Sequence, residues 1–369
     1  MKLNIKRKEL KNALSIISKA VNSKGPLPAM KGILIEVKDG KVVLTGASEE
    51  CAVTAELDKE QYLIYEEGTI LLDCETLNII LISSEQEEIS IEVIDGSLVE
   101  IKAGKAEFKI SSMDVNNYPT IEFLDEEVTL SLSKKEYNEI IEQVTYAAAE
   151  ERSRIFLTGI NLKCIGNKLF CSATDTQRLA RKIIECQAKK EFNIIVPSLV
   201  LRRFNNIAAD HETINLLVNN KYIQYEFNNF KIRINLIEDK FIEIEQLFNL
   251  TINNQLEIDA DKMNKIVERA INIANEKKGT INLRAENNMV EIRSNSEEIG
   301  TFKDEIECDS FEGLPLNISF NGCQLKDALK TLLGKKIVMK FSGIERPYIV
   351  QEIGNDNLVH LLTPIKTNY

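Results

Sequence analysis

Hydrophobic and polar residues follow the same order three times along the chain. Residues 3–21, 130–148 and 256–274 align without a gap, and each begins with the apolar–polar alternation that is typical of a short strand. The apolar residues then recur at the three- and four-residue spacing of a helix with one buried face. Each segment therefore predicts a strand followed by a helix. In the first segment the apolar face consists of Leu10, Ala13, Leu14 and Ile17.

A second strand–helix unit also repeats. Residues 70–82, 194–206 and 318–330 align at an interval of 124 residues. In each of them an apolar strand leads into a helix. Asp73 and Asn321 stand at this junction, where a short polar side chain accepts hydrogen bonds from the first N–H groups of the helix.

Most of the remaining sequence alternates apolar and polar residues between turn signals. Turns at Asp39-Gly40, Asp95-Gly96 and Asn228-Asn229 predict antiparallel hairpins. Gly159 follows Gly32 by 127 residues, and the segments that begin at these two glycines align without a gap. The chain is thus predicted to be an α+β protein of repeated modules, each with two helices and about eight strands in antiparallel sheets. The three predicted modules are 1–125, 126–250 and 251–369.

The composition is that of a globular protein with an acidic surface. The chain has 369 residues, of which 44% are hydrophobic and 28% charged, and its formal net charge is −11. No apolar run approaches the roughly 20 residues that cross a bilayer, and the N-terminus lacks the pattern of a secretion signal. We therefore expect a cytoplasmic protein without a membrane partner.

Groups suited to catalysis or metal binding are few. His211 and His360 are the only histidines, and the sequence contains no phosphate loop, no HExxH motif and no nucleophile–histidine pairing. The cysteines lack CxxC spacing, and their odd number argues against a disulfide framework. We expect no catalytic residue, no metal site and no cofactor. The seven cysteines are Cys51, Cys74, Cys164, Cys171, Cys186, Cys308 and Cys323.

Several motifs, in a fixed order and spacing, resemble those of the bacterial beta sliding clamp, the processivity subunit of the replicative DNA polymerase. They include "LPAMKGILIE" at 27–36, "NYPTIE" at 117–122, "ATDTQRLA" at 173–180 and "LLTPIK" at 361–366. The resemblance covers nearly the whole chain. It implies the DNA clamp fold, in which two chains join head to tail in a closed ring with helices around the hole and sheets outside.

The distribution of charge agrees with such a ring. The six predicted helices carry a formal net charge of +6, which leaves −17 for the rest of the chain. Basic helices attract duplex DNA, which has about one negative charge per 1.7 Å of axis, without reading its bases. The helices are predicted at 7–19, 74–86, 134–143, 198–208, 261–269 and 324–336. The candidate DNA-binding residues are Lys8, Lys11, Lys24, Arg152, Arg154, Arg202, Arg203, Lys265 and Arg269.

The resemblance also implies a cleft between the second and third modules that binds short peptides of partner proteins, commonly with a glutamine followed by leucine and phenylalanine. Family members usually have glycine and histidine at Thr176 and Gln177, proline at Ile242, and often arginine at Gln246. An internal ion pair between Asp175 and Arg178 is an alternative to a binding role for these two residues. The candidate cleft residues are Leu157, Thr174, Asp175, Arg178, Leu179, Ile242, Leu247, Leu361, Thr363, Pro364 and Ile365.

The resemblance places the contact between the two chains of the ring at the first and third modules. Phe108 and Ile110 of one chain would face Ile271 and Ile273 of the other. The implied partners are duplex DNA bound without sequence specificity, a second copy of the chain, a replicative polymerase subunit, an ATP-dependent clamp loader, and other replication and repair proteins that bind clamps.

Two other functions stay open at this point. One is a divergent protein with the clamp fold that acts as an interaction scaffold without a role on DNA. The other is a metal-dependent nuclease, which would use some of the dispersed carboxylates. The sequence favours a non-enzymatic DNA sliding clamp over both.

Overall fold

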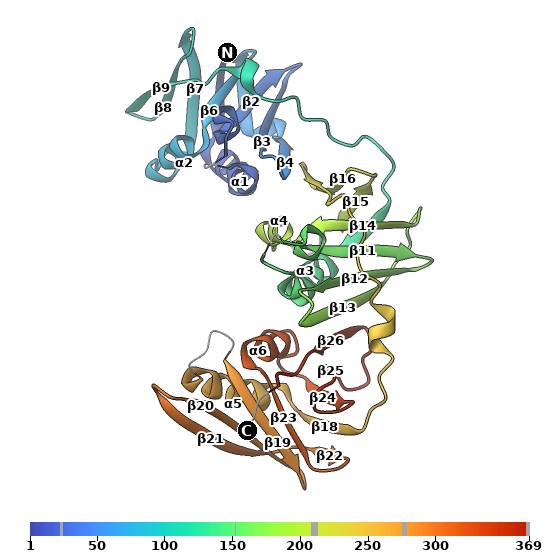
Figure 1. The fold of residues 1–369 in the computed structure, drawn as a ribbon. Helices are drawn as coiled ribbons and strands as arrows, with labels where there is room; N and C mark the ends of the chain where they lie inside the picture. Colours follow the sequence, from blue (N-terminus) through green and yellow to red (C-terminus); the bar gives the residue numbers. More distant parts are fainter. Residues whose placement is uncertain (23–24, 152, 208–212, 275–278, 367–369) are drawn as a thin grey trace. The chain divides into compact units, whose positions relative to one another are not determined.

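The computed structural model describes residues 1–22, 25–151, 153–207, 213–274 and 279–366 (Figure 1). The chain forms two compact units, each built on two antiparallel sheets. The units do not coincide with the three predicted modules, so the module boundaries stay a prediction. The first unit comprises Met1–Tyr137, Gln187–Lys190 and Val200–Leu236, and the second comprises Asn138–Cys186, Glu191–Leu199 and the residues from Ile237 onward.

The first unit contains a sheet of five strands and a sheet of eight. In the five-stranded sheet the order is β5 (Tyr62–Glu66), β1 (Lys2–Lys6), β7 (Glu88–Asp95), β8 (Leu98–Ala103) and β9 (Ala106–Ser111). In the eight-stranded sheet it is β10 (Leu130–Ser133), β15 (Thr213–Val218), β16 (Tyr222–Phe227), β17 (Phe230–Asn235), β4 (Cys51–Glu56), β3 (Lys41–Ala47), β2 (Gly32–Lys38) and β6 (Gly68–Asp73).

The second unit contains a sheet of nine strands and a sheet of four. The nine strands follow the order β14 (Phe192–Pro197), β11 (Gly159–Ile165), β12 (Lys168–Thr174), β13 (Arg178–Glu185), β26 (Leu358–Leu362), β25 (Tyr348–Glu352), β24 (Lys336–Phe341), β18 (Asn254–Asp259) and β22 (Ser310–Glu312). The four strands follow the order β21 (Gly300–Glu307), β20 (Met289–Ser296), β19 (Thr280–Glu286) and β23 (Leu316–Asn321).

The helices confirm the repeat predicted from the sequence. The described residues contain six α-helices, and the first helix of each repeat starts at Arg7, Lys134 or Ala260, at intervals of 127 and 126 residues. The second helix of each repeat starts at Cys74, Ser198 or Gly322, at intervals of 124 residues. The helices are α1 (Arg7–Ile17), α2 (Cys74–Ser83), α3 (Lys134–Val144), α4 (Ser198–Arg203), α5 (Ala260–Ile273) and α6 (Gly322–Lys330).

Four of the predicted helices were too long, and those predicted at 7–19 and 74–86 end at Ile17 and Ser83. The helix predicted at 261–269 was too short, because α5 continues to Ile273. The other two of the four long predictions differ more. The helix predicted at 198–208 ends at Arg203, because Asn206 has a left-handed φ of 55° that stops helical hydrogen bonding. The helix predicted at 324–336 begins at Gly322 and ends at Lys330, and the chain reverses at Gly334 with φ 76° before entering β24. Lys335 and Lys336, which were predicted to be helical, therefore lie outside α6.

The predicted caps and turns are confirmed. Asp73 accepts a hydrogen bond from the N–H of Thr76 at 2.8 Å, and Asn321 accepts one from the N–H of Gln324 at 3.1 Å. The hairpins turn at the expected positions, where a positive φ matches the twist of the strands. These residues are Asp39, Gly40, Gly96 and Asn228.

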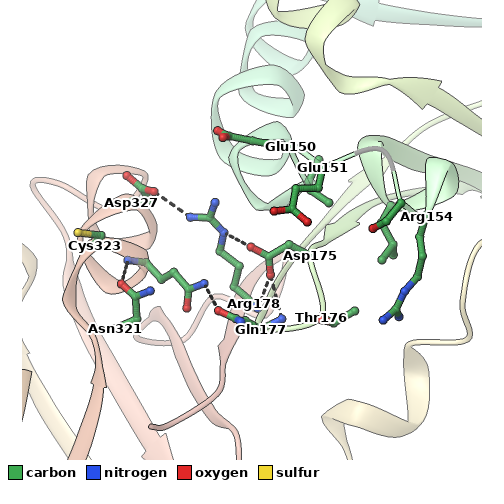
Figure 2. A pocket seen from close by; sticks show the side chains of 15 residues that line it. Glu150, Glu151, Arg154, Asp175, Thr176, Gln177, Arg178, Asn321, Cys323 and Asp327 are labelled. Atoms are coloured by element: carbon green, nitrogen blue, oxygen red, sulfur yellow. Dashed lines mark hydrogen bonds and ion pairs between the residues drawn. The ribbon is translucent and has the colours of Figure 1, made fainter. Parts of the chain in front are cut away.

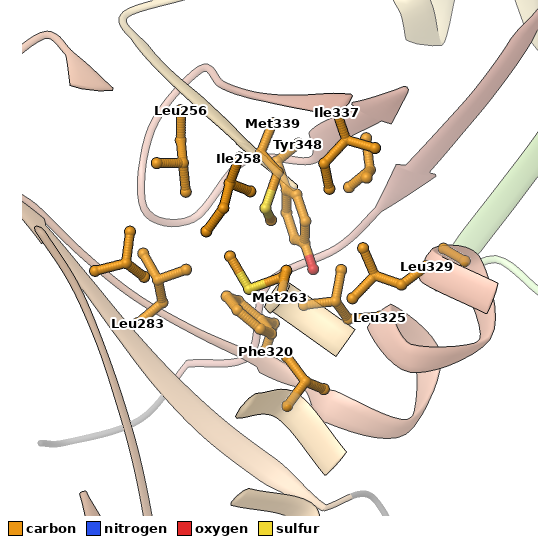
Figure 3. Close-up of a cluster of buried hydrophobic side chains, with 14 of the residues drawn as sticks. Leu256, Ile258, Met263, Leu283, Phe320, Leu325, Leu329, Ile337, Met339 and Tyr348 are labelled. Carbon is orange, nitrogen blue, oxygen red and sulfur yellow. The ribbon is translucent and has the colours of Figure 1, made fainter. Parts of the chain in front are cut away.

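The helices α1, α2, α5 and α6 contact the strands of their units. In the second unit, α5 and α6 pack against each other and bury Met263, Leu325 and Leu329 against the strands (Figure 3). The rings of Phe320 and Tyr348 lie 5.5 Å apart in this core. Figure 3 shows the Tyr348 hydroxyl pointing toward the apolar side chains of the two helices, and within the described residues it has no hydrogen-bond partner.

Substitution of this tyrosine is expected to stabilise the protein. A buried hydroxyl without a partner keeps its desolvation cost, so Tyr348→Phe should raise the free energy of unfolding by about 1 kcal/mol. The matched control is Tyr137→Phe, because the Tyr137 hydroxyl donates to the carbonyl of Phe204 at 3.3 Å and its loss should lower the free energy by about the same amount. Urea denaturation measures both, and a destabilised Tyr348→Phe protein would contradict the assignment.

Candidate functional site

The turn between β12 and β13 is closed by side chains of the predicted cleft. The Thr174 hydroxyl donates to the Arg178 carbonyl at 2.6 Å and accepts from the N–H of Thr176 at 3.0 Å. One Asp175 carboxylate oxygen accepts from the N–H groups of Gln177 and Arg178, both at 2.9 Å. This network holds Thr176 at φ 78°, a conformation that β-branched residues rarely adopt and glycine adopts easily.

Arg178 joins this turn to helix α6. Its guanidinium lies 3.0 Å from an Asp175 oxygen and 2.8 Å from an Asp327 oxygen (Figure 2). The same group lies over the ring of Tyr146, 5.3 Å from its centroid. The Arg178 side chain is only 14% exposed, so its charge is compensated inside the protein. The internal ion pair that the sequence left open is therefore present.

A cavity of about 530 Å³ opens beside this turn. Its lining is mainly polar, and Gln177 accepts a hydrogen bond from the Gln324 amide at 3.1 Å across it (Figure 2). We call it the turn pocket. It is lined by Ala148, Ala149, Glu150, Glu151, Ser153, Arg154, Leu157, Asp175, Thr176, Gln177, Arg178, Asn321, Cys323, Gln324 and Asp327.

The other predicted cleft residues form a row across the sheet next to the pocket. Thr174 pairs with Leu179, which pairs with Leu361, and Leu361 pairs with Ile349, so their side chains lie on one face. Leu179 and Leu361 are buried in a cluster with Ile244, Ile349 and Val359, against which Phe248 and Leu250 pack. Two predicted residues of the neighbouring segment stay accessible: Ile242 is 38% and Leu247 41% exposed.

The C-terminal motif is fixed to the turn. Thr363 donates from its N–H and its hydroxyl to the Gln177 carbonyl, each at 2.9 Å. Pro364 forms a bridge with Phe320, and the N–H of Ile365 donates to the Ser319 carbonyl at 2.7 Å. The structure thus brings most of the predicted cleft residues together in two adjoining parts, a polar turn pocket and an apolar row. Ile242 and Leu247 belong neither to the pocket lining nor to the buried cluster of the row.

A buried histidine lies behind the turn. His360 is fully buried, with Nδ1 2.7 Å from the Tyr146 hydroxyl and Nε2 2.7 Å from the Thr331 hydroxyl. Neutral imidazole satisfies both hydroxyls because one nitrogen donates and the other accepts. Burial lowers the pKa of His360 to about 3, because the protonated ring would lose its hydration.

The candidate DNA-binding residues fall into three groups. Lys8, Lys11, Arg154 and Lys265 are exposed and form no ion pair within the described part of the chain. Arg203 lies 2.9 Å from Glu50, Arg269 lies 2.7 Å from Asp304, and Arg202 is half-buried. Lys24 and Arg152 lie outside the described residues.

The observed helix bounds reduce the predicted charge separation without removing it. The helices carry +2 in α1, −1 in α2, −1 in α3, +2 in α4, +1 in α5 and +1 in α6, which gives +4. Because the net charge of the whole chain is −11, the residues outside the helices carry −15. The predicted value of +6 was too high because Lys19, Lys335 and Lys336 lie outside the α-helices, although the loss of Glu85 from α2 offsets one of these charges.

The four residues of the predicted chain–chain contact are all half-buried. Phe108 and Ile110 lie on β9, which ends the five-stranded sheet. Ile271 and Ile273 lie in the last turn of α5, and Ile271 packs tightly over Gly279 and Gly322. Ile271 therefore also supports the core of its own unit.

Some site residues were missed by the sequence reasoning. Asp327, Gln324 and Tyr146 contact the turn from positions distant in the sequence, and no motif identified them. Asn321 was recognised only as a helix cap. Among the described residues, no group of three or more His, Cys, Asp or Glu side chains could hold a metal ion. In the same residues, no helix is long and apolar enough to cross a membrane.

Comparisons with known proteins match the whole chain. Three families described as the N-terminal, central and C-terminal domains of the DNA polymerase III beta subunit match residues 1–122, 131–243 and 246–366. The chain is 29% identical to proteins named beta sliding clamp from Staphylococcus epidermidis and Staphylococcus aureus, with 100% of both chains covered.

Solved structures agree with this match. The DNA polymerase sliding clamp of Bacillus subtilis superposes with a TM-score of 0.96 at 26% identity, over 100% of this chain and 99% of the other. The beta chain of DNA polymerase III from Streptococcus pneumoniae gives 0.95 at 25% identity, over 99% and 100%.

The repeated two-helix modules and the cleft beside the turn define a protein of the DNA clamp class. Within that class, the chain belongs to the family of DNA polymerase III beta subunits, the bacterial beta sliding clamps. The resemblance and the fold class predicted from the sequence are thereby confirmed.

The buried histidine makes stability depend on pH. In the unfolded chain His360 has an ordinary pKa of about 6.5, whereas the folded protein binds this proton only near pH 3. Unfolding therefore takes up a proton between these values, and the free energy of unfolding should fall by up to about 1.4 kcal/mol per pH unit below pH 6.5 through this residue.

The variant His360→Gln should lose this contribution. Its free energy of unfolding, measured by urea denaturation, should therefore decline less steeply between pH 6.5 and pH 4 than that of wild type. The comparison rests on the slope, because the substitution also changes packing. Equal slopes in the two proteins would show that His360 is protonated as easily in the folded chain as in the unfolded one.

Proposed function

We propose that this chain is a DNA sliding clamp that forms a homodimeric ring around duplex DNA. The ring holds DNA without sequence specificity and tethers a replicative polymerase subunit and other replication and repair proteins through the cleft. The observation that carries the proposal is the match of all three beta-subunit domains, in order, across the chain. Processivity then follows from enclosure and not from tight binding.

The hold on DNA is assigned to exposed basic residues on helices. Lys8 and Lys11 on α1 and Lys265 on α5 lie on the faces opposite the buried stripes. Attraction between such cations and phosphates does not depend on register, so the ring slides, whereas hydrogen bonds to base edges would fix it at one sequence. Arg203 and Arg269 are weaker candidates because each already has a carboxylate partner.

The two parts of the cleft suit the two kinds of side chain in the peptide motif. Amide groups of Gln177, Gln324 and Asn321 line the turn pocket and match a glutamine side chain. Ile242 and Leu247 are accessible beside the apolar row and match the following leucine and phenylalanine. Most binding free energy in such interfaces comes from a few apolar anchors.

The ring closes when the first module of one chain meets the third module of its partner. Module boundaries at 1–125, 126–250 and 251–369 are supported by family matches that end at residues 122 and 243. Phe108 and Ile110 facing Ile273 would supply the apolar centre of the contact. An ATP-dependent loader opens the ring, the clamp itself needs no catalysis or cofactor, and it acts in the cytoplasm, where the chromosome is.

A divergent scaffold without a role on DNA is the alternative, favoured by the departures at Thr176, Gln177, Ile242 and Gln246. A processivity assay on primed circular DNA, with a clamp loader and polymerase, separates the two functions. A clamp extends the products, and a scaffold leaves them unchanged. DNA breakdown in the presence of magnesium alone would instead indicate a nuclease.

Charge reversal tests the hold on DNA. The variant Lys8→Glu with Lys265→Glu should load onto nicked circular DNA at least about tenfold less than wild type at 0.1 M salt, because each chain changes by four charges. The control Lys221→Glu with Lys240→Glu reverses two exposed lysines outside the helices and should load normally.

Retention after loading tests enclosure. Loaded wild-type protein should stay on circles and leave the same DNA once it is linearised, as gel filtration of the complexes measures. Equal dissociation from circles and linear DNA would contradict the ring. Equal loading of the two charge variants would remove Lys8 and Lys265 from the DNA-binding residues.

Substitution of exposed residues tests the cleft without disturbing the core. Leu179 is buried, so its change to aspartate would unfold the sheet; Ile242→Asp with Leu247→Asp changes accessible side chains instead. The variant should bind a labelled peptide with the glutamine–leucine–phenylalanine motif at least about tenfold more weakly, because two anchors are lost.

The matched control is Leu333→Asp with Leu314→Asp, two residues of the same unit that are 45% and 80% exposed and belong neither to the turn pocket nor to the buried cluster of the apolar row. It should bind the peptide as wild type does. Fluorescence anisotropy gives the affinities, and circular dichroism checks folding. Unchanged binding by the Ile242–Leu247 variant would place the peptide elsewhere.

A further inference from the structure

Two cysteine sulfurs meet in the nine-stranded sheet. Cys164 on β11 and Cys186, directly after β13, have Sγ atoms 3.8 Å apart. In the described part of the chain, which includes all seven cysteines, no other pair of sulfurs is within hydrogen-bond distance. Neither residue lies in the turn pocket or in the apolar row.

The backbone fixes this approach. The hairpin between β11 and β12 turns at Gly166, which has φ 56°, and the N–H of Cys186 donates to the carbonyl of Asn167 in the same turn at 2.9 Å. Asn167 follows Ile165, the last residue of β11, by two residues. The hydrogen bond to Asn167 therefore holds the end of β13 beside the hairpin. A disulfide requires sulfurs about 2.05 Å apart, so the two Sγ atoms must approach by roughly 1.8 Å from their present separation.

Access to the pair is one-sided. Cys164 is fully buried, whereas Cys186 is half-buried and reaches solvent. A small oxidant therefore meets Cys186 first, and Cys164 lies next to it inside the sheet.

We propose that Cys164 and Cys186 are an oxidisable pair that closes to an intramolecular disulfide when the protein meets a hydroperoxide. The site is independent of the clamp function. In the reducing cytoplasm the resting state is the dithiol, and the disulfide forms under oxidative stress.

The chemistry balances in two steps. The Cys186 thiolate attacks one oxygen of hydrogen peroxide, the O–O bond breaks, and after proton transfer a sulfenic acid and one water result. The Cys164 sulfur then attacks the Cys186 sulfur, and its thiol proton leaves with the displaced hydroxyl as a second water. Two thiols are oxidised by two electrons and one peroxide is reduced to two waters.

The second step depends on pH. Burial raises the pKa of the Cys164 thiol to about 12, with further increase from Cys186 beside it. Little Cys164 thiolate is present at neutral pH, so closure of the disulfide accelerates as the pH rises toward 9.

The bond would stabilise the sheet without closing the cleft. It links positions 22 residues apart and so reduces the conformational freedom of the unfolded chain. Cys186 follows the end of β13 that is opposite to Arg178, where the turn pocket lies.

Mass spectrometry of the full-length protein tests the proposal. After treatment with hydrogen peroxide and alkylation of remaining thiols, wild type should lose 2 Da per disulfide, retain five alkylated cysteines, and yield one cross-linked peptide pair containing Cys164 and Cys186. The midpoint of thermal unfolding should rise by about 5–10 °C and return after dithiothreitol.

Variants assign the two roles. Cys186→Ser should give no disulfide, and Cys164→Ser should stop at a sulfenic acid on Cys186 that dimedone labels. Cys171→Ser is the matched control, because Cys171 is buried in the intervening strand β12 and should leave the bond unaffected. A disulfide that involves another cysteine, or peroxide-treated wild type with all seven thiols still alkylated or with Cys186 oxidised to sulfinic acid, would overturn the proposal.

Discussion

Pairing of sheet edges between repeats is the constraint on which the site depends. A module with open edge strands exposes unpaired backbone groups, and here those edges are filled by strands of the next repeat. In the first unit β17 pairs with β4, and in the second β13 pairs with β26. The second pairing brings Leu179 and Leu361 into one row and sets the turn at 174–178 against α6. The cleft therefore exists only because two repeats share a sheet.

Charge distribution is a second consequence of the repeat. The apolar face of each helix must pack on a sheet, which leaves the opposite face as the only position for charged residues. On α1 and α5 that face carries lysines, while the strands and loops carry most of the carboxylates. An acidic protein can thus present basic helices to a polyanion, which the net charge of −11 alone would not suggest.

The sequence allowed the prediction of the features that repeat or are local. The strand–helix order, the caps at Asp73 and Asn321 and the hairpin turns follow from spacing and residue type, and the structure has them. Helix ends were less predictable, because a single left-handed residue such as Asn206 ends a helix whose apolar pattern continues. The partners of the turn could not be predicted, since Arg178 meets Asp327 across 149 residues of sequence and no pattern encodes that contact. Likewise, the sequence could not show that Leu179 is buried while Leu247 is accessible.

The turn contains two of the departures from the family pattern, Thr176 and Gln177, which bear on the proposed peptide binding. Thr176 occupies a backbone conformation that suits glycine, at a cost of order 1–3 kcal/mol that the hydrogen bonds of Thr174 and Asp175 must offset. The threonine adds an exposed methyl and hydroxyl to the pocket, and the Gln177 side-chain oxygen already accepts a hydrogen bond from the Gln324 amide. A partner peptide must fit around the Thr176 side chain and compete with the hydrogen bond between Gln177 and Gln324. Under the proposed function, specificity would thus be set at two neighbouring positions of one strained turn, while the accessible Ile242 and Leu247 would supply the apolar contacts.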